Sequence, residues 1–350
     1  MQDATGAGKG SAGTILITGS AGFIGFHLAQ AMLAQGWRVV GVDNHNSYYD
    51  PALKAAREAR LTPDHRYRAV RGGIEEPGLL ARIFAEERPG AVVHLAAQAG
   101  VRHSIDNPRA YVQANLIGTF ELLEAARACP PRHLLLASTS SAYGANTEMP
   151  YRETDKADSQ MSFYAATKKS TEAMAHSYAH LFALPITMFR FFTVYGPWGR
   201  PDMAPYLFTS AILAGRPIRV FNHGEMRRDF TYIDDIVEGV RRALDVVPEP
   251  DPSWSGKEPD PGTSLAPYRL YNIGNHQPVE LMHLIRTLEE ALGLEAKMEM
   301  LPLQPGDVPA TFADIEDLAR ATGFRPHTPI EQGVKRFVHW YRHEWIPIAG

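Results

Sequence analysis

The sequence contains a single cysteine, Cys129, in 350 residues. One thiol cannot form a disulfide within the chain, so a disulfide framework of the kind that holds small secreted domains together is excluded. Low cysteine content fits a reducing compartment, and we therefore expect a cytoplasmic protein.

The sequence also lacks long apolar runs and a surplus of positive charge. No run approaches the roughly 18 apolar residues of a membrane-spanning helix, and residues 1–13 have no apolar centre like that of a signal peptide. The formal net charge is -4, without a Lys/Arg-rich segment that would suit a nucleic-acid backbone. We expect a disordered tail over residues 1–13 and neither a membrane nor a nucleic-acid partner.

What the sequence does contain is an alternation of short apolar runs with longer amphipathic segments. Such continuous apolar runs are typical of parallel strands that are buried on both faces. The alternation predicts an α/β fold, a Rossmann-type doubly wound parallel sheet. The predicted strands are residues 14–18, 37–42, 91–97, 133–138 and 185–191.

Proline breaks this alternation after Arg190, and a Pro-rich loop follows at residues 248–262. The change indicates a second, smaller α+β domain that binds the substrate. We place a disordered tail at 1–13, the Rossmann domain at 14–192 with part of 233–275 returning to it, and the substrate domain mainly at 193–350. Helices are predicted at residues 233–247, 279–293 and 330–345.

Three glycines, Gly19, Gly22 and Gly25, directly follow the first predicted strand. In a turn between strand and helix, the first allows the tight turn, the second lets the backbone approach a pyrophosphate, and the third lets the helix lie close to the strand. This context predicts a dinucleotide site. Asp43 ends the second predicted strand, where an acid accepts from the adenosine ribose and repels a 2'-phosphate, which favours NAD over NADP.

The stretch ASTSSAYG places four hydroxyl side chains at positions 138–141, after a buried strand and without an acid. Farther along, Tyr164 and Lys168 are four residues apart and share a helix face. An ammonium group beside Tyr164 and a positive nicotinamide ring stabilise its phenolate, which can then act as a base. We expect Thr139 to share the proton of a substrate alcohol with Tyr164. The alternative is a set of hydroxyls that only satisfies local hydrogen bonds.

Together these motifs resemble the extended short-chain dehydrogenase/reductase family of nucleotide-sugar enzymes, from about Thr14 to the last helix. The matching stretches are GFIGFHLA, VDNHNSYYD, HLAAQAGVRHSIDNPRAYVQANLIGT, YAATKK, RFFTVYGPWGRPDMA, RRDFTYIDD, YNIGN and LPLQPGDV. The resemblance implies bound NAD, a UDP-sugar substrate and a homodimer in which the helices at 109–128 and 162–182 pair into a four-helix bundle.

The resemblance also implies which residues form the site, and no metal is among its components. The catalytic residues would be Thr139, Tyr164 and Lys168. The cofactor would contact Gly19, Gly22, Phe23, Ile24, Gly25, Asp43, Asn44, Ala96, Ala97, Gln98, Asn115 and Phe191. The substrate would contact Arg102, Ser140, Ser141, Thr193, Arg200, Arg228, Arg269 and Asp307.

Within the substrate set, the resemblance implies that Arg228 meets the diphosphate and that Asp307 and Arg269 meet the uridine end. A carboxylate would be held by Ser141, Thr193 and Arg200. Each assignment has a structural alternative. The arginines can form ordinary ion pairs, Asp307 can stabilise a turn after Pro-Gly, and Asn115 can be a polar neighbour of the core.

Two positions depart from other members of the family. Gly73 stands where many members have an Asp that meets the adenine amine, so this contact would fall to backbone or to Glu75. Gln304 stands where UDP-galactose 4-epimerases often have an Arg. Ser140 and Ser141 also occupy the places where dehydratases and decarboxylases of the family carry an acid, and hydroxyl groups cannot abstract the carbon 5 proton as a carboxylate does.

The resemblance therefore implies reversible epimerisation at carbon 4 of UDP-glucuronate to UDP-galacturonate, by transient oxidation with bound NAD. The alternatives are epimerisation of UDP-glucose and UDP-galactose, decarboxylation of UDP-glucuronate, and a catalytically inactive scaffold that senses NAD. Arg200 and Thr193 argue against a neutral sugar. The intact set of Thr139, Tyr164 and Lys168 argues against an inactive scaffold.

Overall fold

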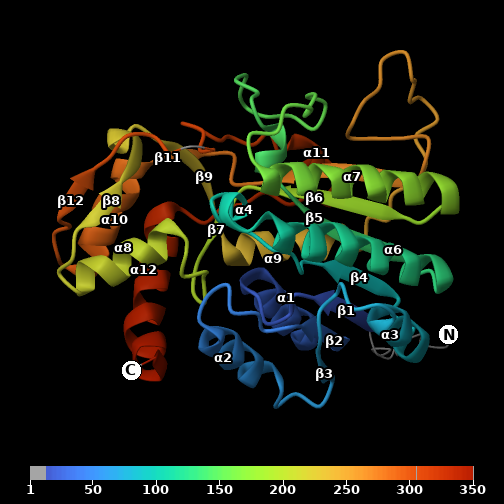
Figure 1. Cartoon of the computed structure of the whole chain (residues 1–350), viewed down its shortest axis with the longest axis horizontal. Coiled ribbons are helices and arrows are strands. Elements are labelled where there is room, and N and C mark those ends of the chain that lie inside the picture. The colour runs from blue at the N-terminus through green and yellow to red at the C-terminus, as the bar shows by residue number, and fades with distance from the viewer. Residues whose placement is uncertain (1–12, 305, 350) are drawn as a thin grey trace, which may run out of the picture.

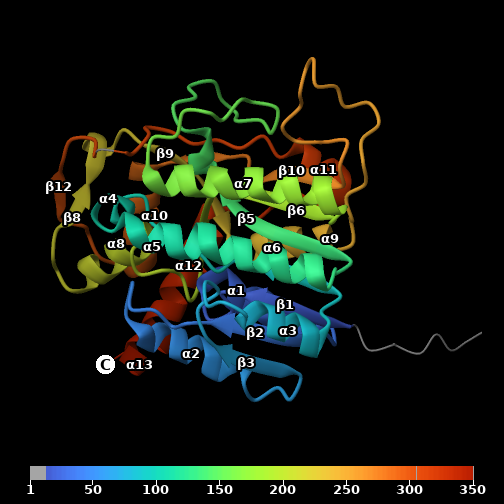
Figure 2. The ribbon, with the colours of Figure 1, turned by 45° about the vertical axis from the view of Figure 1, so that its right-hand side comes forward.

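The computed structural model describes residues 13–304 and 306–349 (Figure 1). The tail expected at residues 1–13 therefore lies, except for Gly13, outside the described residues. Two groups of elements are visible in Figures 1 and 2: a large sheet covered by helices, and a smaller group of helices and short strands at one end of it.

The large sheet has seven parallel strands in the order β10-β6-β5-β4-β1-β2-β3. All five predicted strands are present, and the doubly wound fold is confirmed. The direction of the strand order reverses between β1 and β4, where ligands bind in open sheets of this kind. The strands are β1 Thr14–Thr18, β2 Arg38–Asp43, β3 Tyr67–Arg71, β4 Ala91–His94, β5 His133–Thr139, β6 Ile186–Phe191 and β10 Tyr268–Ile273.

The strand predicted at 91–97 ends earlier, at His94. The amide of Leu95 still donates to the Thr18 carbonyl, but the next amide, that of Ala96, donates to the Thr18 hydroxyl instead. The chain leaves the sheet there and passes over the turn that follows β1. The early end of β4 therefore shapes the edge of the sheet at the switch point.

Alternate residues of β1 explain why its three central residues are all apolar. Ile15 and Ile17 pack on one face of the sheet in a core that includes helices α1 Phe23–Ala34 and α9 Ile233–Ala243. Leu16 packs on the other face with α3 Leu79–Glu87, α6 Gly118–Ala128 and α7 Phe163–Phe182. Both faces are covered, as expected for a parallel sheet. Figure 2 shows α6 and α7 side by side over one face.

The smaller region is α+β, as predicted. It has a three-stranded sheet in the order β11-β9-β7 and a parallel pair of β8 with β12. The helix predicted at 279–293 begins at Leu281, because residues 278–280 pair with β9 as a short strand. Its elements are β7 Thr193–Tyr195, α8 Ala204–Leu213, β8 Ile218–Val220, β9 Arg227–Tyr232, β11 Pro278–Glu280, α10 Leu281–Leu292, β12 Met298–Met300, α11 Glu316–Thr322, α12 Ile330–Trp340, a π-turn Tyr341–Trp345 and α13 Ile346–Ala349.

Strand β10 and helix α9 lie with the large sheet although they follow β7 in the sequence. Strand β10 pairs with β6, and α9 packs against α1. The domain limits given above remain a proposal. The other helices are α2 Pro51–Leu61, α4 His103–Asp106, α5 Pro108–Tyr111, a π-helix Val112–Ile117 and the 3-10 turns Ser140–Tyr143 and Phe221–Gly224. Within the described residues, no helix combines the length and hydrophobicity needed to cross a membrane.

Candidate active site

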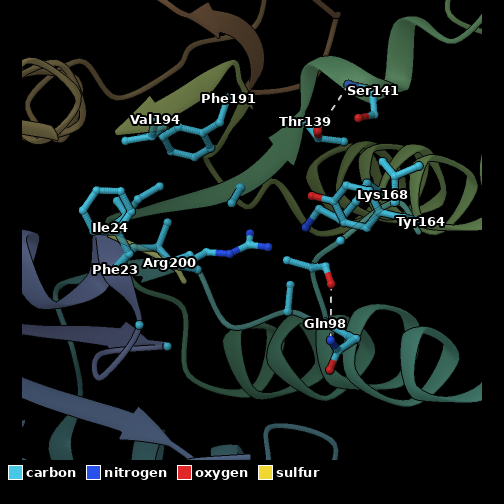
Figure 3. Close-up of a pocket in the computed structure, with 18 of the residues that line it drawn as sticks. Phe23, Ile24, Gln98, Thr139, Ser141, Tyr164, Lys168, Phe191, Val194 and Arg200 are labelled. Atoms are coloured by element: carbon cyan, nitrogen blue, oxygen red, sulfur yellow. Dashed lines mark hydrogen bonds between the residues drawn. The ribbon is translucent and has the colours of Figure 1, made fainter. Parts of the chain in front are cut away.

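A cavity of about 450 Å³ opens at the carboxyl ends of the strands, at the switch point between β1 and β4. Figure 3 shows Tyr164 and Lys168 reaching into it from one side and Arg200 from the other. Most of the predicted site residues line this cavity. They are Gly19, Gly22, Phe23, Ile24, Gly25, Asp43, Asn44, Ala96, Ala97, Gln98, Thr139, Ser140, Ser141, Tyr164, Lys168, Phe191, Thr193, Arg200, Arg228 and Asp307.

The glycines after β1 form a tight turn that has no room for a side chain at Gly19 or Gly22. Gly19 has φ 72°, and a Cβ on it would lie 2.8 Å from the backbone nitrogen of Ala96. A Cβ on Gly22 would lie 2.9 Å from the carbonyl oxygen of Gly19. Helix α1 begins directly after Gly22, so its first N–H groups face the cavity end of the turn. This bare backbone at a helix N-terminus fits a diphosphate.

The Asp43 carboxylate is held at the end of β2. It accepts from the amide of Ala21 at 3.2 Å and from that of His45 at 2.8 Å, and Lys54 Nζ lies 3.5 Å from it. The carboxylate therefore joins the glycine turn to the segment after β2. Lys54, which sequence analysis did not single out, is buried and also donates to Asn46 at 3.0 Å.

Asn115 does not line the cavity but holds a segment that does. Its Oδ1 accepts from the amide of Gln98 at 2.8 Å, and its Nδ2 donates to the Gln98 carbonyl at 3.1 Å. The same Nδ2 donates to Thr167 Oγ1, on α7, at 3.0 Å. Asn115 thus connects the loop after β4 to the helix that carries Tyr164.

The four hydroxyl side chains of residues 138–141, at the end of β5 and just after it, have different hydrogen-bond partners. Ser138 is buried, and its hydroxyl donates to Glu172 at 2.6 Å, so it belongs to the packing under the site. Thr139 accepts from the amide of Ser141 at 3.2 Å, which orients the 3-10 turn that follows. All four residues line the cavity, but the hydroxyl of Ser138 is already engaged with Glu172. Only three of the four hydroxyls are therefore available for chemistry.

Burial governs the acid–base properties of Tyr164 and Lys168. Burial raises the pKa of Tyr164, while hydrogen bonding with Thr139 and the positive charge of Arg200 lower it. Burial lowers the pKa of Lys168 to about 8, against the raising influence of the Glu172 carboxylate. Arg200 therefore adds a positive charge that favours the phenolate, beside Lys168 and the nicotinamide ring, to which sequence analysis assigned that effect.

A second cavity of about 580 Å³ adjoins the first, and Thr193, Met203, Arg228 and Asp307 line both. Arg102 lines the second cavity, donates to Asp307 at 3.2 Å and stacks its guanidinium 4.9 Å from the Phe221 ring centre. Burial lowers the pKa of Arg228. Both of its recorded bonds go to backbone carbonyls, those of Arg227 and Pro309.

Sequence analysis did not identify several residues of the second cavity, among them Arg219 and Phe221, because single basic or aromatic residues are common in any sequence. The only signal was an arginine two residues before a phenylalanine, Arg219 and Phe221. Arg269, by contrast, does not line either cavity. It lies on β10, an edge strand of the sheet, and donates to the neighbouring Tyr268 carbonyl at 2.8 Å. The structure does not bring it to the predicted uridine end.

Comparison with known proteins places this geometry in a family. Residues 15–254 match the NAD dependent epimerase/dehydratase family. The chain is 53% identical to a probable UDP-glucuronate 4-epimerase of Rhizobium meliloti (strain 1021) over 327 residues, 93% of this chain and 96% of the relative. It is 51% identical to Protein CapI of Staphylococcus aureus over 328 residues, 93% and 98% of the two chains.

Among solved structures, the fold is similar to that of a UDP-glucuronic acid 4-epimerase from Bacillus cereus in complex with UDP-glucuronic acid and NAD. The TM-score is 0.84 at 31% identity, and the match covers 94% of this chain and 99% of the other. The match with the family covers more than half of the sequence, and the relatives match it nearly end to end. The chain therefore belongs to the NAD dependent epimerase/dehydratase family.

Proposed function

We propose that this protein interconverts UDP-glucuronate and UDP-galacturonate by transient oxidation at carbon 4. The observation that carries the proposal is one cavity that combines Tyr164, Lys168 and three hydroxyls with the cation of Arg200. The names of its relatives support the same substrate, since two of the proteins compared above are described as UDP-glucuronate 4-epimerases.

NAD is the cofactor, and the chain provides a fitting cradle for it. The turn of Gly19, Gly22 and Gly25 with the first turn of α1 would hold the diphosphate, and Asp43 would accept from the adenosine ribose. The remaining proposed contacts come from Phe23, Ile24, Asn44, Ala96, Ala97, Gln98 and Phe191, with Asn115 acting through Gln98. When bound, NAD supplies the oxidant and then the reductant for carbon 4.

Tyr164 moves the proton in this proposal. Its phenolate oxygen takes the proton of the substrate alcohol at carbon 4 and returns it after the sugar has turned its other face. Thr139 orients that alcohol, and the positive charge of Arg200 favours the phenolate. The ammonium of Lys168, four residues along the same helix, would favour it in the same way. The Bacillus cereus enzyme has also been solved as a tyrosine-to-phenylalanine variant with NAD and a 4-deoxy-4-fluoro substrate analogue.

The carboxylate of the oxidised sugar needs restraint. A glucuronate with a ketone at carbon 4 is a β-keto acid, which loses carbon dioxide when the bond to its carboxylate stands perpendicular to the ketone plane. Thr193, Ser141 and Arg200 hold the carboxylate near that plane through charge-assisted hydrogen bonds. Ser140 adds a neutral hydroxyl where an acid would carry the ketone further.

The nucleotide extends into the second cavity. Arg228, at the wall shared by the two cavities, meets the diphosphate, and Asp307 with Arg102 lies toward the uridine. Among the described residues, Arg228 donates to neutral carbonyls and forms no hydrogen bond with a carboxylate, which suits a residue that meets an anion. Arg269 has no place in this arrangement.

The experiment is to incubate the purified protein with UDP-glucuronate and resolve the products. UDP-galacturonate is expected, and Tyr164→Phe should lower its formation by about 10²- to 10⁴-fold while substrate binding persists. Exclusive turnover of UDP-glucose would support the neutral-sugar alternative, and a UDP-pentose would support decarboxylation. Full activity of the Tyr164→Phe variant would overturn the assignment of the base.

A homodimer and a cytoplasmic location are also proposed. Helices α6 and α7 lie against each other, and this region leaves large apolar side chains exposed at Ile117, Phe120, Phe163, Leu181 and Phe182. Pairing of the two helices with those of a second copy would cover these side chains. Sedimentation of the purified protein tests the dimer. The single cysteine supports the location, since it fits a reducing compartment.

A further inference from the structure

The guanidinium of Arg200 is clamped along one of its edges. Nε donates to Asp202 Oδ1 at 3.0 Å, and Nη2 donates to Asp202 Oδ2. Within residues 13–304 and 306–349, Nη1 donates no hydrogen bond. A guanidinium has a second edge, formed by its two Nη atoms, and that edge remains open to a planar anion.

The pair lies in the wall between the two cavities. Arg200 lines the first cavity and Asp202 the second, and their side chains are 25% and 31% exposed. Figure 3 shows the Arg200 guanidinium directed toward Tyr164. The open edge of Arg200 is therefore presented on the side where the substrate sugar reacts.

Asp202 is itself held by a residue from the cofactor side. Tyr48 Oη donates to Asp202 Oδ2 at 2.9 Å. Tyr48 belongs to the segment after β2, five residues beyond Asp43 and 154 residues before Asp202. Burial and the Asp202 charge raise the pKa of Tyr48 to about 12, so it remains a donor at neutral pH.

The backbone before Arg200 has a separate anchor. Arg57, which is fully buried, donates from Nε to the Trp198 carbonyl at 3.1 Å and from Nη1 to the Ala21 carbonyl at 3.0 Å. Ala21 belongs to the glycine turn. The segment 198–202 is thus tied to the cofactor-binding region at both ends, and little freedom remains for the Arg200 side chain.

We infer that Asp202, held by Tyr48, is a positioning residue that determines specificity for a sugar carboxylate by directing the open edge of Arg200 toward it. This inference rests on the proposed function. A neutral sugar has no carboxylate to match that edge, so the difference between the two sugars lies in the two directed hydrogen bonds that the edge offers to a carboxylate. A variant in which Arg200 loses this orientation should therefore turn over UDP-glucuronate less efficiently and UDP-glucose as well as before.

The test compares kcat/KM for UDP-glucuronate and UDP-glucose in the wild type, Asp202→Asn and Tyr48→Phe. For Asp202→Asn we expect about a tenfold loss with UDP-glucuronate, mainly in KM, and less than about a twofold change with UDP-glucose. Tyr48→Phe should show the same selective loss at about threefold, because the clamp persists without its anchor. If UDP-glucose turnover is too slow to measure, the dissociation constants of the two UDP-sugars can be compared instead, with each variant combined with Tyr164→Phe.

A matched control is Asp317→Asn, which removes an exposed aspartate that accepts from Arg320 at 2.8 Å on α11. It should change kcat/KM for neither UDP-sugar. Equal losses with both sugars in Asp202→Asn, or a gain with UDP-glucuronate, would overturn the inference. Failure of the wild type to turn over UDP-glucuronate would overturn the proposed function itself, and the inference with it.

Discussion

The carboxylate of Glu75 occupies the space that a side chain at position 73 would take. A Cβ on Gly73 would lie 2.6 Å from Glu75 Oε1, and Oε2 of the same carboxylate is buried without a hydrogen-bond partner. Glu75 also lines the cavity. An acid side chain from two residues later thus lies where the resemblance led us to expect an acid at position 73.

This relationship predicts a role in binding the cofactor. Glu75→Gln should weaken NAD binding by about three- to tenfold, since a carboxylate accepts more strongly than an amide from the adenine amine. The dissociation constant of NAD, measured by calorimetry without substrate, checks it. Glu86→Gln, at an exposed glutamate of α3, is the control. Unchanged NAD affinity in Glu75→Gln would show that backbone alone meets the adenine.

Removal of the groups proposed to hold the sugar carboxylate should release carbon dioxide. In Thr193→Ala and Ser141→Ala, the carboxylate of the keto sugar can rotate out of the ketone plane. We expect a UDP-pentose at about ten times the wild-type level, with epimerisation slowed. Chromatography of the products measures both. If substrate binding is unchanged and no pentose forms, the restraint lies elsewhere.

The packing under the hydroxyls of residues 138–141 depends on a buried ion pair. Arg190 is fully buried and donates to Glu172 from Nε at 2.9 Å and from Nη2 at 2.8 Å. Glu172→Gln should lower the free energy of unfolding by about 3–5 kcal/mol, because it leaves the arginine charge buried and unpaired. Denaturant unfolding measures the loss.

The control for that variant is Glu316→Gln, which breaks a similar two-bond pair with Arg325 that is about half exposed. It should cost less than about 1 kcal/mol. Equal effects of the two variants would show that burial of the Arg190 pair has no special weight.

The buried carboxyl group of Glu153 should make the free energy of unfolding depend on pH. Burial raises its pKa to about 7, although its Oε1 accepts from the Asn272 amide at 2.6 Å. A carboxyl with a raised folded-state pKa stabilises the fold below its unfolded pKa, near 4.5, and loses this contribution as pH rises through about 7. Glu153→Gln should therefore stabilise the protein by roughly 1–3 kcal/mol at pH 8 and have little effect at pH 4.5. Unfolding curves at both values check it, and the same shift at both would contradict it.

The sequence by itself determined the parts of the protein that depend on neighbours along the chain. Alternation of apolar residues such as Ile15 and Leu16 specifies a strand buried on both faces, and glycine spacing specifies the turn before α1. The four-residue spacing of Tyr164 and Lys168 likewise brings them to one helix face. Polar strands such as β10 were less visible, because Arg269 and Asn272 interrupt the apolar pattern.

Only the tertiary structure decided which distant residues meet. It joined Tyr48 to Asp202 and Arg57 to Trp198, placed Glu75 beside Gly73, and left Arg269 outside both cavities. The physical reason is that side-chain spacing within a helix or strand follows from covalent geometry, whereas the contacts of a loop side chain depend on how whole elements pack. The catalytic and cofactor-binding residues could therefore be predicted from the sequence, but the contact of Asp202 with Arg200 could not.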